Sequence, residues 1–208
     1  NWVFANTLNY LRTFDKHTIG ALLGIETNRY QEEYFSASRE GFASDDDNFH
    51  FLDAGDSGSQ KNAGSAFTSK MMSYFGKIDY NFDNRYLFAA TFRRDGSSKL
   101  GNNKWGNFPA VSAGWRISSE PFYDIPAISN MKVRIGWGQT GNSDIPAYST
   151  IDSYMSNPNH SNYPIDGSQS SVTTGYTQTR YGNANLKWET TTQTNVGLDL
   201  GFLDNSLT

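Results

Sequence analysis

A chain of 208 residues can hold one or two domains, so its length excludes no class of globular protein. Its composition is more selective, because 15% of the residues are aromatic and only 18% are charged, below the roughly 25% typical of soluble domains. The net charge of −4 comes without any Lys/Arg-rich cluster, which argues against a nucleic-acid partner, and the absence of cysteine excludes disulfides and thiolate metal sites.

The hydropathy of the sequence distinguishes a helical membrane protein from a transmembrane β-barrel. The mean hydropathy of −0.62 is polar, and no run approaches the ~18 to 20 consecutive apolar residues of a membrane-spanning helix. A transmembrane β-barrel fits these values, because its strands alternate lipid-facing apolar residues with lumen-facing polar ones and average out as polar. The sequence therefore excludes a helical membrane protein and is compatible with a barrel.

The chain starts with two segments of alternating polarity, residues 2–12 and 18–28, joined by a short turn at 15–17. This period of two is typical of strands with one apolar face, so the pair is predicted to form a hairpin. The first residues lie inside this alternation, without a secretion leader, and the last residues look like the beginning of a further strand. We interpret both ends as cuts in a longer protein.

The stretch from about 29 to 68 is acidic, rich in Gly and Ser, and without sustained periodicity, which predicts a long loop. Alternation returns at 69–82 and at 86–94, with a tight turn between them. This pattern predicts a second hairpin, in which Lys77 and Asp79 face a polar lumen.

A polar segment, 95–107, leads to a third predicted hairpin, formed by strands at 108–118 and 131–140 around a connection with one helical turn. A second long polar stretch, 141–185, contains several prolines and is predicted to be a loop. The last strand is predicted over about 186–202, which gives seven strands in all.

The connections alternate between short and long. The short ones lie at 13–17, 83–85, 119–130 and 203–206, and the long ones at 29–68, 95–107 and 141–185. In an up-and-down meander every second connection lies at the same end, and outer-membrane barrels have short periplasmic turns and long extracellular loops. The predicted strands also reach the ~9 to 11 residues of a membrane crossing, and aromatic residues gather near their ends, as at a headgroup level. The predicted fold is all-β: an antiparallel up-and-down transmembrane β-barrel segment that occupies residues 1–208.

Four segments carry distinctive motifs in a fixed order. They are 93–101 (RRDGSSKLG, continuing to FPA at 108–110), 112–118 (SAGWRIS), 136–142 (GWGQTGN) and 185–199 (NLKWETT, then NVGLD). Together they resemble SusC/RagA-type TonB-linked outer-membrane proteins of Bacteroidota-like bacteria. The resemblance covers about residues 69–142 and 183–202, whereas the two long loops match only in position.

The resemblance implies import of oligosaccharides or peptides across the bacterial outer membrane, driven by TonB and shared with a SusD-like surface lipoprotein. A barrel of this class needs about 22 strands around a plugged lumen, so we expect the plug domain, the TonB-contacting segment and the other strands to lie outside these residues. Open sheet edges are not tolerated in hydrocarbon. The seven strands are therefore expected to pair with other parts of a parent protein.

Three further motifs match functional patterns without the required context. Residues 55–58 (GDSG) resemble a serine-protease nucleophile segment but lie in a predicted loop, and His17, His50 and His160 fall in unrelated contexts. The GWGQTG motif spells a dinucleotide fingerprint, but nothing after it predicts a helix, and the three aspartates at 45–47 lack the EF-hand spacing. We predict no enzyme activity, no cofactor and no metal.

Substrate contacts in such an importer are expected from aromatic residues of the long loops and from polar lumen-facing residues near the outer rim. Position selects Arg93, Trp105, Tyr148, Tyr154 and Tyr163. For each of them, packing against other loops or against the lipoprotein is the competing interpretation. Two other functions stay open at this point: a secreted soluble β-sheet module that binds carbohydrate, and a plain diffusion porin.

Overall fold

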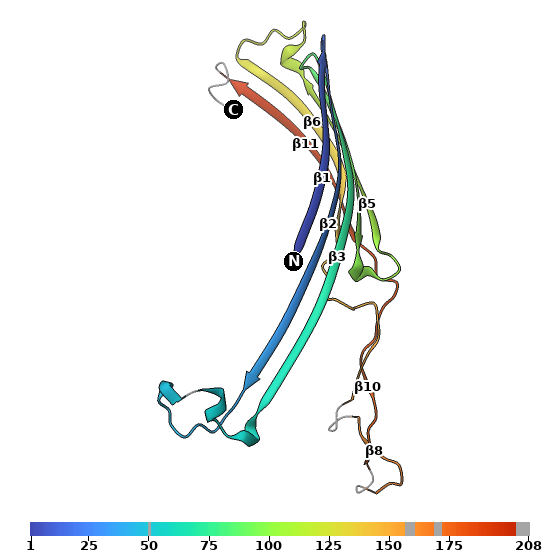
Figure 1. The fold of residues 1–208 in the computed structure, drawn as a ribbon. Helices are drawn as coiled ribbons and strands as arrows, with labels where there is room; N and C mark the ends of the chain where they lie inside the picture. Colours follow the sequence, from blue (N-terminus) through green and yellow to red (C-terminus); the bar gives the residue numbers. More distant parts are fainter. Residues whose placement is uncertain (50, 157–160, 169–171, 203–208) are drawn as a thin grey trace.

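The computed structural model describes residues 1–49, 51–156, 161–168 and 172–202 (Figure 1). One antiparallel sheet of seven strands forms its main body, in the order β1-β2-β3-β4-β5-β6-β11. These strands are β1 (Trp2–Phe14), β2 (His17–Ser38), β3 (Lys61–Phe82), β4 (Tyr86–Ser97), β5 (Trp105–Arg116), β6 (Ile128–Asn142) and β11 (Glu189–Phe202). Among the described residues, no helix is long and apolar enough to cross a membrane.

Within the described residues, four short strands and five single-turn 3-10 helices accompany the sheet. Strand β7 (Ser153–Met155) pairs with β10 (Thr177–Arg180), and β8 (Tyr163–Pro164) pairs with β9 (Val172–Thr173). The helical turns are η1 (Asp47–Phe49), η2 (Leu52–Ala54), η3 (Ser57–Ser59), η4 (Ser98–Leu100) and η5 (Ile117–Ser119). The single helical turn expected between the fifth and sixth strands is present as η5.

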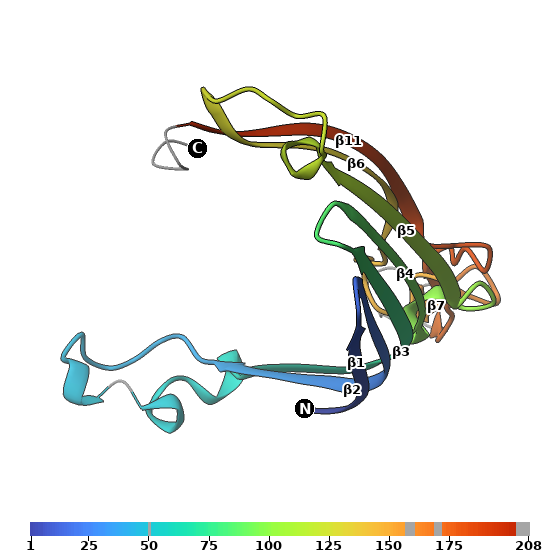
Figure 2. The same ribbon diagram turned by 90° about the horizontal axis from the view of Figure 1, so that it is seen from above.

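The sheet is a curved wall, and seen from above its strands follow an open arc from β1 to β11 (Figures 1 and 2). The connections β1–β2, β3–β4 and β5–β6 lie at one end, called here the short-turn end, and β2–β3, β4–β5 and β6–β11 lie at the other, called here the long-loop end. The alternation of lengths has one exception, because the β4–β5 connection, residues 98–104, is shorter than the β5–β6 connection, residues 117–127. The all-β meander with seven main strands, predicted from alternation and loop lengths, is confirmed. The short turn expected at 203–206 lies outside the described residues.

The second and third strands are longer than the sequence predicts. Residues 29–38 and 61–68, expected to be loop, are strand, and β2 and β3 stay in register over 22 residues each, from His17 opposite Phe82 to Ser38 opposite Lys61. The acidic and Gly/Ser-rich composition hides this pairing, because backbone hydrogen bonds between two strands need no apolar face. Only residues 39–60 form the loop.

The GDSG motif at 55–58 lies in that loop and builds a turn. Asp56 accepts a hydrogen bond from the Gly58 backbone N–H at 3.0 Å and caps η3. Arg39 closes the loop by donating from Nη1 to the backbone carbonyls of Asp53 and Gly55, at 3.1 and 3.3 Å. The motif thus has a local structural explanation; His50 and His160 lie outside the described residues.

The stretch expected as a second long loop is a projecting arm, defined here as residues 143–188. It holds the two small strand pairs, and Figure 1 shows β8 and β10 beyond the ends of β5, β6 and β11, at the level that the long β2–β3 hairpin also reaches. Backbone bonds close its base, where the Asn183 N–H donates to the Ser149 carbonyl at 3.1 Å. Strand β6 continues two residues past its predicted end, and β11 begins at Glu189 rather than at 186.

Strict alternation gives the sheet two chemically different faces. In β3, for example, Met72, Tyr74 and Ile78 share one face, while Ser73 and Lys77 share the other. The cross-strand register continues each set over the neighbouring strands. One face is therefore mainly apolar and the other mainly polar.

Aromatic rings line the apolar face near the short-turn end. His17 stacks on Phe14 with 5.3 Å between ring centroids and contacts the ring of Phe82 at 4.9 Å, and Phe82 stacks on Tyr86 at 6.2 Å. His17 and Tyr80 also share a hydrogen bond of 2.8 Å between Nδ1 and the hydroxyl. This band connects β1 to β4, and such belts of amphipathic rings are typical of strands that end at a membrane interface.

Candidate functional site on the concave face

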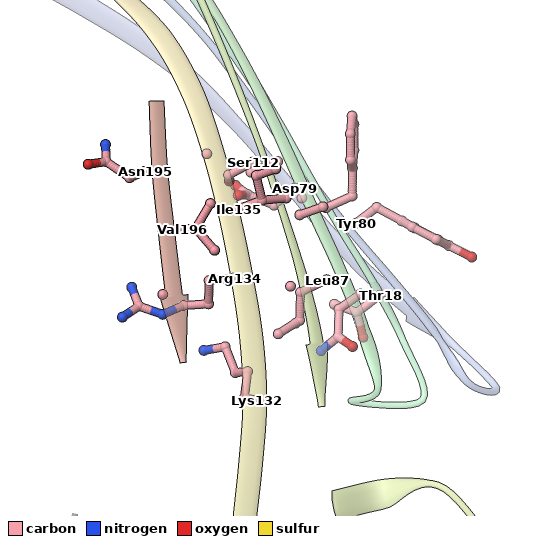
Figure 3. A pocket seen from close by; sticks show the side chains of 18 of the residues that line it. Thr18, Asp79, Tyr80, Leu87, Ser112, Lys132, Arg134, Ile135, Asn195 and Val196 are labelled. Atoms are coloured by element: carbon pink, nitrogen blue, oxygen red, sulfur yellow. The ribbon is translucent and has the colours of Figure 1, made fainter. Parts of the chain in front are cut away.

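The polar face is the concave one. Figure 3 shows Lys132, Arg134 and Asn195 projecting to one side of β6 and β11, and Tyr80 projecting to the other. A pocket of about 780 Å³, called here the lower pocket, lies on the concave side toward the short-turn end, and both apolar and charged residues line it. Its charged groups are paired, because Asp199 accepts from Arg134 at 2.8 Å and lies 3.6 Å from the Lys132 ammonium.

A second pocket, called here the rim pocket, lies on the same face at the long-loop end. Its volume is about 400 Å³, and strands β2 to β4 contribute one wall while the end of β6 and both ends of the arm contribute the other. The residues that line it are Asn28, Ser69, Lys70, Met71, Arg93, Asp95, Ser97, Lys99, Gly141, Asn142, Ser143, Asp144 and Trp188.

Arg93 is the central cation of the rim pocket. Its Nε donates to both carboxylate oxygens of Asp95 at 2.8 Å, and its Nη2 donates to Ser73 Oγ at 3.0 Å. The guanidinium carbon also lies 5.4 Å from the centroid of the Phe75 ring. Because Asp95 is 8% exposed and Ser73 only 1%, the arginine is held by groups that cannot move freely.

The local sequence explains this arrangement. Arg93 and Asp95 are two residues apart in β4, so alternation places both on the concave face. The register sets Arg93 opposite Phe75 in β3 and Asp95 opposite Ser73. The Phe75 ring lies over Gly24 of β2, where any Cβ would overlap it, so the glycine makes room for the ring that supports the cation.

The end of β6 and the two ends of the arm supply the far wall of the rim pocket. Lys99, which follows β4, lies 3.8 Å from the Asp144 carboxylate, and Asn142 donates to Glu189 at 3.2 Å. Trp188 donates from its indole nitrogen to the Lys104 carbonyl at 2.8 Å and meets Phe108 edge to face, with centroids 5.3 Å apart. The β4–β5 loop therefore fixes the base of the arm.

The structure separates the five predicted contact residues. Arg93 lines the rim pocket, but Trp105 lies on the convex face, stacked on Tyr74 with centroids 6.0 Å apart. The three tyrosines are on the arm: Tyr148 before β7 with a positive φ of 64°, Tyr154 in β7 and Tyr163 in β8, each about half exposed or more. They are not brought together with Arg93.

Sequence reasoning did not single out Asp95, Ser73 and Trp188. Asp95 could have been found, because an acid two residues from an arginine in a strand shares its face. Ser73 and Trp188 carry no local signal, since they reach Arg93 and the pocket through cross-strand register and through the fold of the arm. The GWGQTG motif lies within β6, as extended strand, which removes the dinucleotide-site interpretation.

Comparisons with known proteins agree with this geometry. The family model described as TonB dependent receptor-like, beta-barrel matches residues 1–208. The TonB-dependent receptor SusC of Bacteroides thetaiotaomicron is 40% identical over 146 residues, which are 69% of this chain and 14% of that protein. The TonB-dependent receptor P39 of Formosa agariphila is 34% identical over 97% of this chain and 19% of its own length.

Solved structures give the same fold. The chain of the RagAB peptide transporter structure superposes with a TM-score of 0.83 at 29% identity, covering 98% of this chain and 22% of that one. A second RagAB structure, in the 'open-open' state, gives the same TM-score. This chain thus spans about a fifth or less of the length of the relatives it matches. It belongs to the TonB-dependent receptor-like β-barrel family, as a member of the SusC/RagA type.

Proposed function

We propose that this chain forms part of the wall and of the outer-rim surface of an outer-membrane importer for oligosaccharides or peptides. The observation that carries the proposal is the rim pocket, a polar recess on the concave face with a fixed arginine at its centre. Family membership supports the direction of transport, and one of the related structures is that of a peptide transporter, RagAB. The apolar convex face faces lipid in this arrangement.

The partners follow from the same proposal. A SusD-like lipoprotein would meet the long-loop end, where the arm and the loop at 39–60 project beyond the sheet. The lower pocket near the short turns, whose Lys132 and Arg134 pair with Asp199, would face the plug of the parent barrel. Energy from TonB would enter through a segment outside these residues.

The arm tyrosines and Arg93 have different roles in this proposal. Arg93 has a fixed geometry and would contact cargo inside the lumen through its carboxylate-backed guanidinium. Tyr148, Tyr154 and Tyr163 are exposed rings, which suit stacking on sugar or side-chain faces at the entrance. Trp105 is left out of the cargo path, because it lies on the convex face.

The test uses the full-length transporter, with uptake and binding measured for a series of oligosaccharides and a series of peptides. Arg93→Gln should lower cargo affinity about tenfold, as expected for loss of one charged contact. Lys77→Gln is the matched control, because Lys77 is a paired cation on the same face, bound to Asp79 at 2.9 Å but outside the rim pocket. Equal cargo binding by the Arg93 and Lys77 variants would remove the rim pocket from the cargo path.

A further inference from the structure

The concave wall at the short-turn end carries more cations than acids. Lys132 and Arg134 of β6 share one carboxylate, that of Asp199 in β11, at 3.6 and 2.8 Å. Arg116 of β5 is the cross-strand partner of Lys132, so alternation places it on the same face. Three cations thus lie beside a single acid, and these four residues are called here the basic cluster.

Arg116 has no acceptor for its guanidinium. The group forms no ion pair with a residue that the structure describes, and its Nε is buried without a hydrogen-bond partner among them. The nearest acid along the chain, Glu120, lies 3.3 Å from Arg85 instead, and Asp79 of the same concave wall lies 2.9 Å from Lys77. A half-buried charge without a partner is costly, so we expect a resident acceptor here.

The wall around the basic cluster is low. Gly114, Gly136 and Gly197 line the lower pocket and present no side chain to the lumen. A Cβ at Gly197 would lie 3.1 Å from Nη2 of Arg134, and one at Gly114 would lie 3.6 Å from Cε of Lys132. Figure 3 shows these two cations projecting to the same side of the sheet. They therefore stand on a flat floor, of the kind that lets a second backbone approach closely.

The position of the basic cluster selects its occupant. The chain spans about a fifth or less of the length of its relatives, and barrels of about 22 strands have a plugged lumen. Cargo would pass this wall only in transit and would leave the Arg116 guanidinium without an acceptor for most of the time. A plug is a permanent neighbour of the wall, so it can supply that acceptor.

We propose that the basic cluster is a docking surface for an acidic segment of the plug, which belongs to the same parent protein. The inference rests on the proposed function, in which the lower pocket faces the plug. Arg116 and Arg134 bind plug carboxylates through their guanidinium groups, and Lys132 adds a third positive charge. Asp199 holds Lys132 and Arg134 in place. These contacts keep the plug against β5, β6 and β11, so their loss lets it open more easily.

The test measures plug opening in the full-length transporter, reconstituted in planar lipid bilayers. The readout is the ion conductance that appears as urea displaces the plug. Raising KCl from about 0.05 M to about 1 M should lower the urea midpoint of opening, because salt screens the ion pairs. The triple variant R116Q/K132Q/R134Q should raise the open fraction about tenfold at low salt, and its midpoint should no longer depend on KCl.

Two matched controls separate the plug contact from the ion pairs inside the wall. Asp199→Asn breaks the same internal pairs but keeps all three cations, so its midpoint should still depend on KCl. Lys77→Gln removes a paired cation of the same face outside the basic cluster, and it should open as the unaltered protein does. If the triple variant does not assemble into a barrel, R116Q and R134Q are measured singly, and each should show a partial loss of salt dependence.

Salt dependence that persists in the cation variants, or an equal loss of it in the Asp199 variant, overturns the proposal. Unchanged plug opening together with weaker uptake of acidic cargo would also overturn it, because the basic cluster would then serve cargo. Cargo binding at the rim pocket is measured separately with Arg93→Gln, so these outcomes leave the proposed function standing. An unaltered transporter that conducts ions without urea would show an open lumen and would count against both.

Discussion

Glu120 belongs to a network of side-chain contacts that joins the short connections of the sheet. Its side chain is 7% exposed and lies 3.3 Å from Arg85, and it accepts a hydrogen bond from the Trp115 indole at 3.0 Å. Arg85 also pairs with Asp83, which contacts Lys16 at 3.3 Å, so one network joins three successive turns. Hydrogen bonds from Tyr86 and Trp115, and then from Arg85, lower the pKa of Glu120 below its ordinary value of 4.5.

The sign of the pH effect follows from this lowered pKa. A carboxyl whose pKa is lower in the folded state stabilises that state at neutral pH, and the contribution is lost as the pH falls through the lowered pKa. Glu120→Gln should therefore lower the melting temperature of the full-length barrel at pH 7, and the difference from the unaltered protein should shrink below pH 4.5. Asp124→Asn, an exposed acid in the same connection, should change little at either pH. A difference that stays constant with pH would contradict this role for the carboxylate.

Gly141 controls the packing at the base of the arm. A Cβ at this position would overlap the ring of Phe108, which is 6% exposed and packs against Trp188. Gly141→Val should cost about 1–3 kcal/mol in the free energy of unfolding, by overpacking. In a double-mutant cycle with Phe108→Ala, the coupling should be about 0.5–3 kcal/mol, because the smaller side chain removes the clash. Urea titration of the full-length barrel in vesicles measures both values, and strictly additive effects would show that the two sites are independent.

At the scale of elements, the β2–β3 hairpin has two parts: paired strands that belong to the sheet, and a loop at residues 39–60 that lies outside it. Its register is continuous to Ser38 and Lys61, and residues 39–60 are closed by their own contacts, such as the Arg39 bonds to Asp53 and Gly55. Replacing 39–60 by Asn-Gly should therefore leave barrel assembly intact, since this dipeptide suits a two-residue hairpin turn. Heat-modifiable migration of the full-length protein tests this. Loss of the folded band would mean that the loop takes part in assembly.

The same hairpin shows which strands can be predicted from alternating polarity and which cannot. Alternation located all seven main strands, because each has one apolar face over at least part of its length. Alternation does not reveal the strands at residues 29–38 and 61–68, which backbone hydrogen bonds join to each other. Within them the rings of Tyr30 and Phe67 lie with their centroids 5.7 Å apart.

The rim pocket shows the same limit. Position along the sequence selects Arg93, but the cross-strand register brings its partner Ser73 to it, and the fold of the arm brings Trp188 to the pocket. Trp105 was selected as a loop residue, whereas as the first residue of β5 it takes the convex side.

At the scale of the whole molecule, the sheet has three surfaces with different neighbours. The concave face is polar and carries the ion pairs of Arg93 with Asp95 and of Lys132 and Arg134 with Asp199, whereas the convex face is mainly apolar. The outermost strands β1 and β11 each pair on one side within the described chain. Exposed large apolar side chains lie along the convex side of every long strand, for example Leu8, Leu23 and Leu198. A sheet of this kind has no enclosed core of its own. Among the described residues, Leu100 is the one large apolar side chain that is fully buried.

This arrangement predicts how the chain behaves alone. Its convex side chains would face water in plain buffer, and its two edge strands would offer unpaired backbone groups, so aggregation should compete with folding. Expressed by itself, the chain should need detergent to stay in solution and should give no heat-stable folded band. Co-expressed with the remaining part of a parent barrel, its edges would be paired and the folded band should appear, because closure satisfies every backbone group inside hydrocarbon. Cooperative unfolding of the isolated chain in detergent-free buffer, seen by circular dichroism, would show instead that the sheet buries its apolar face without a membrane or further strands.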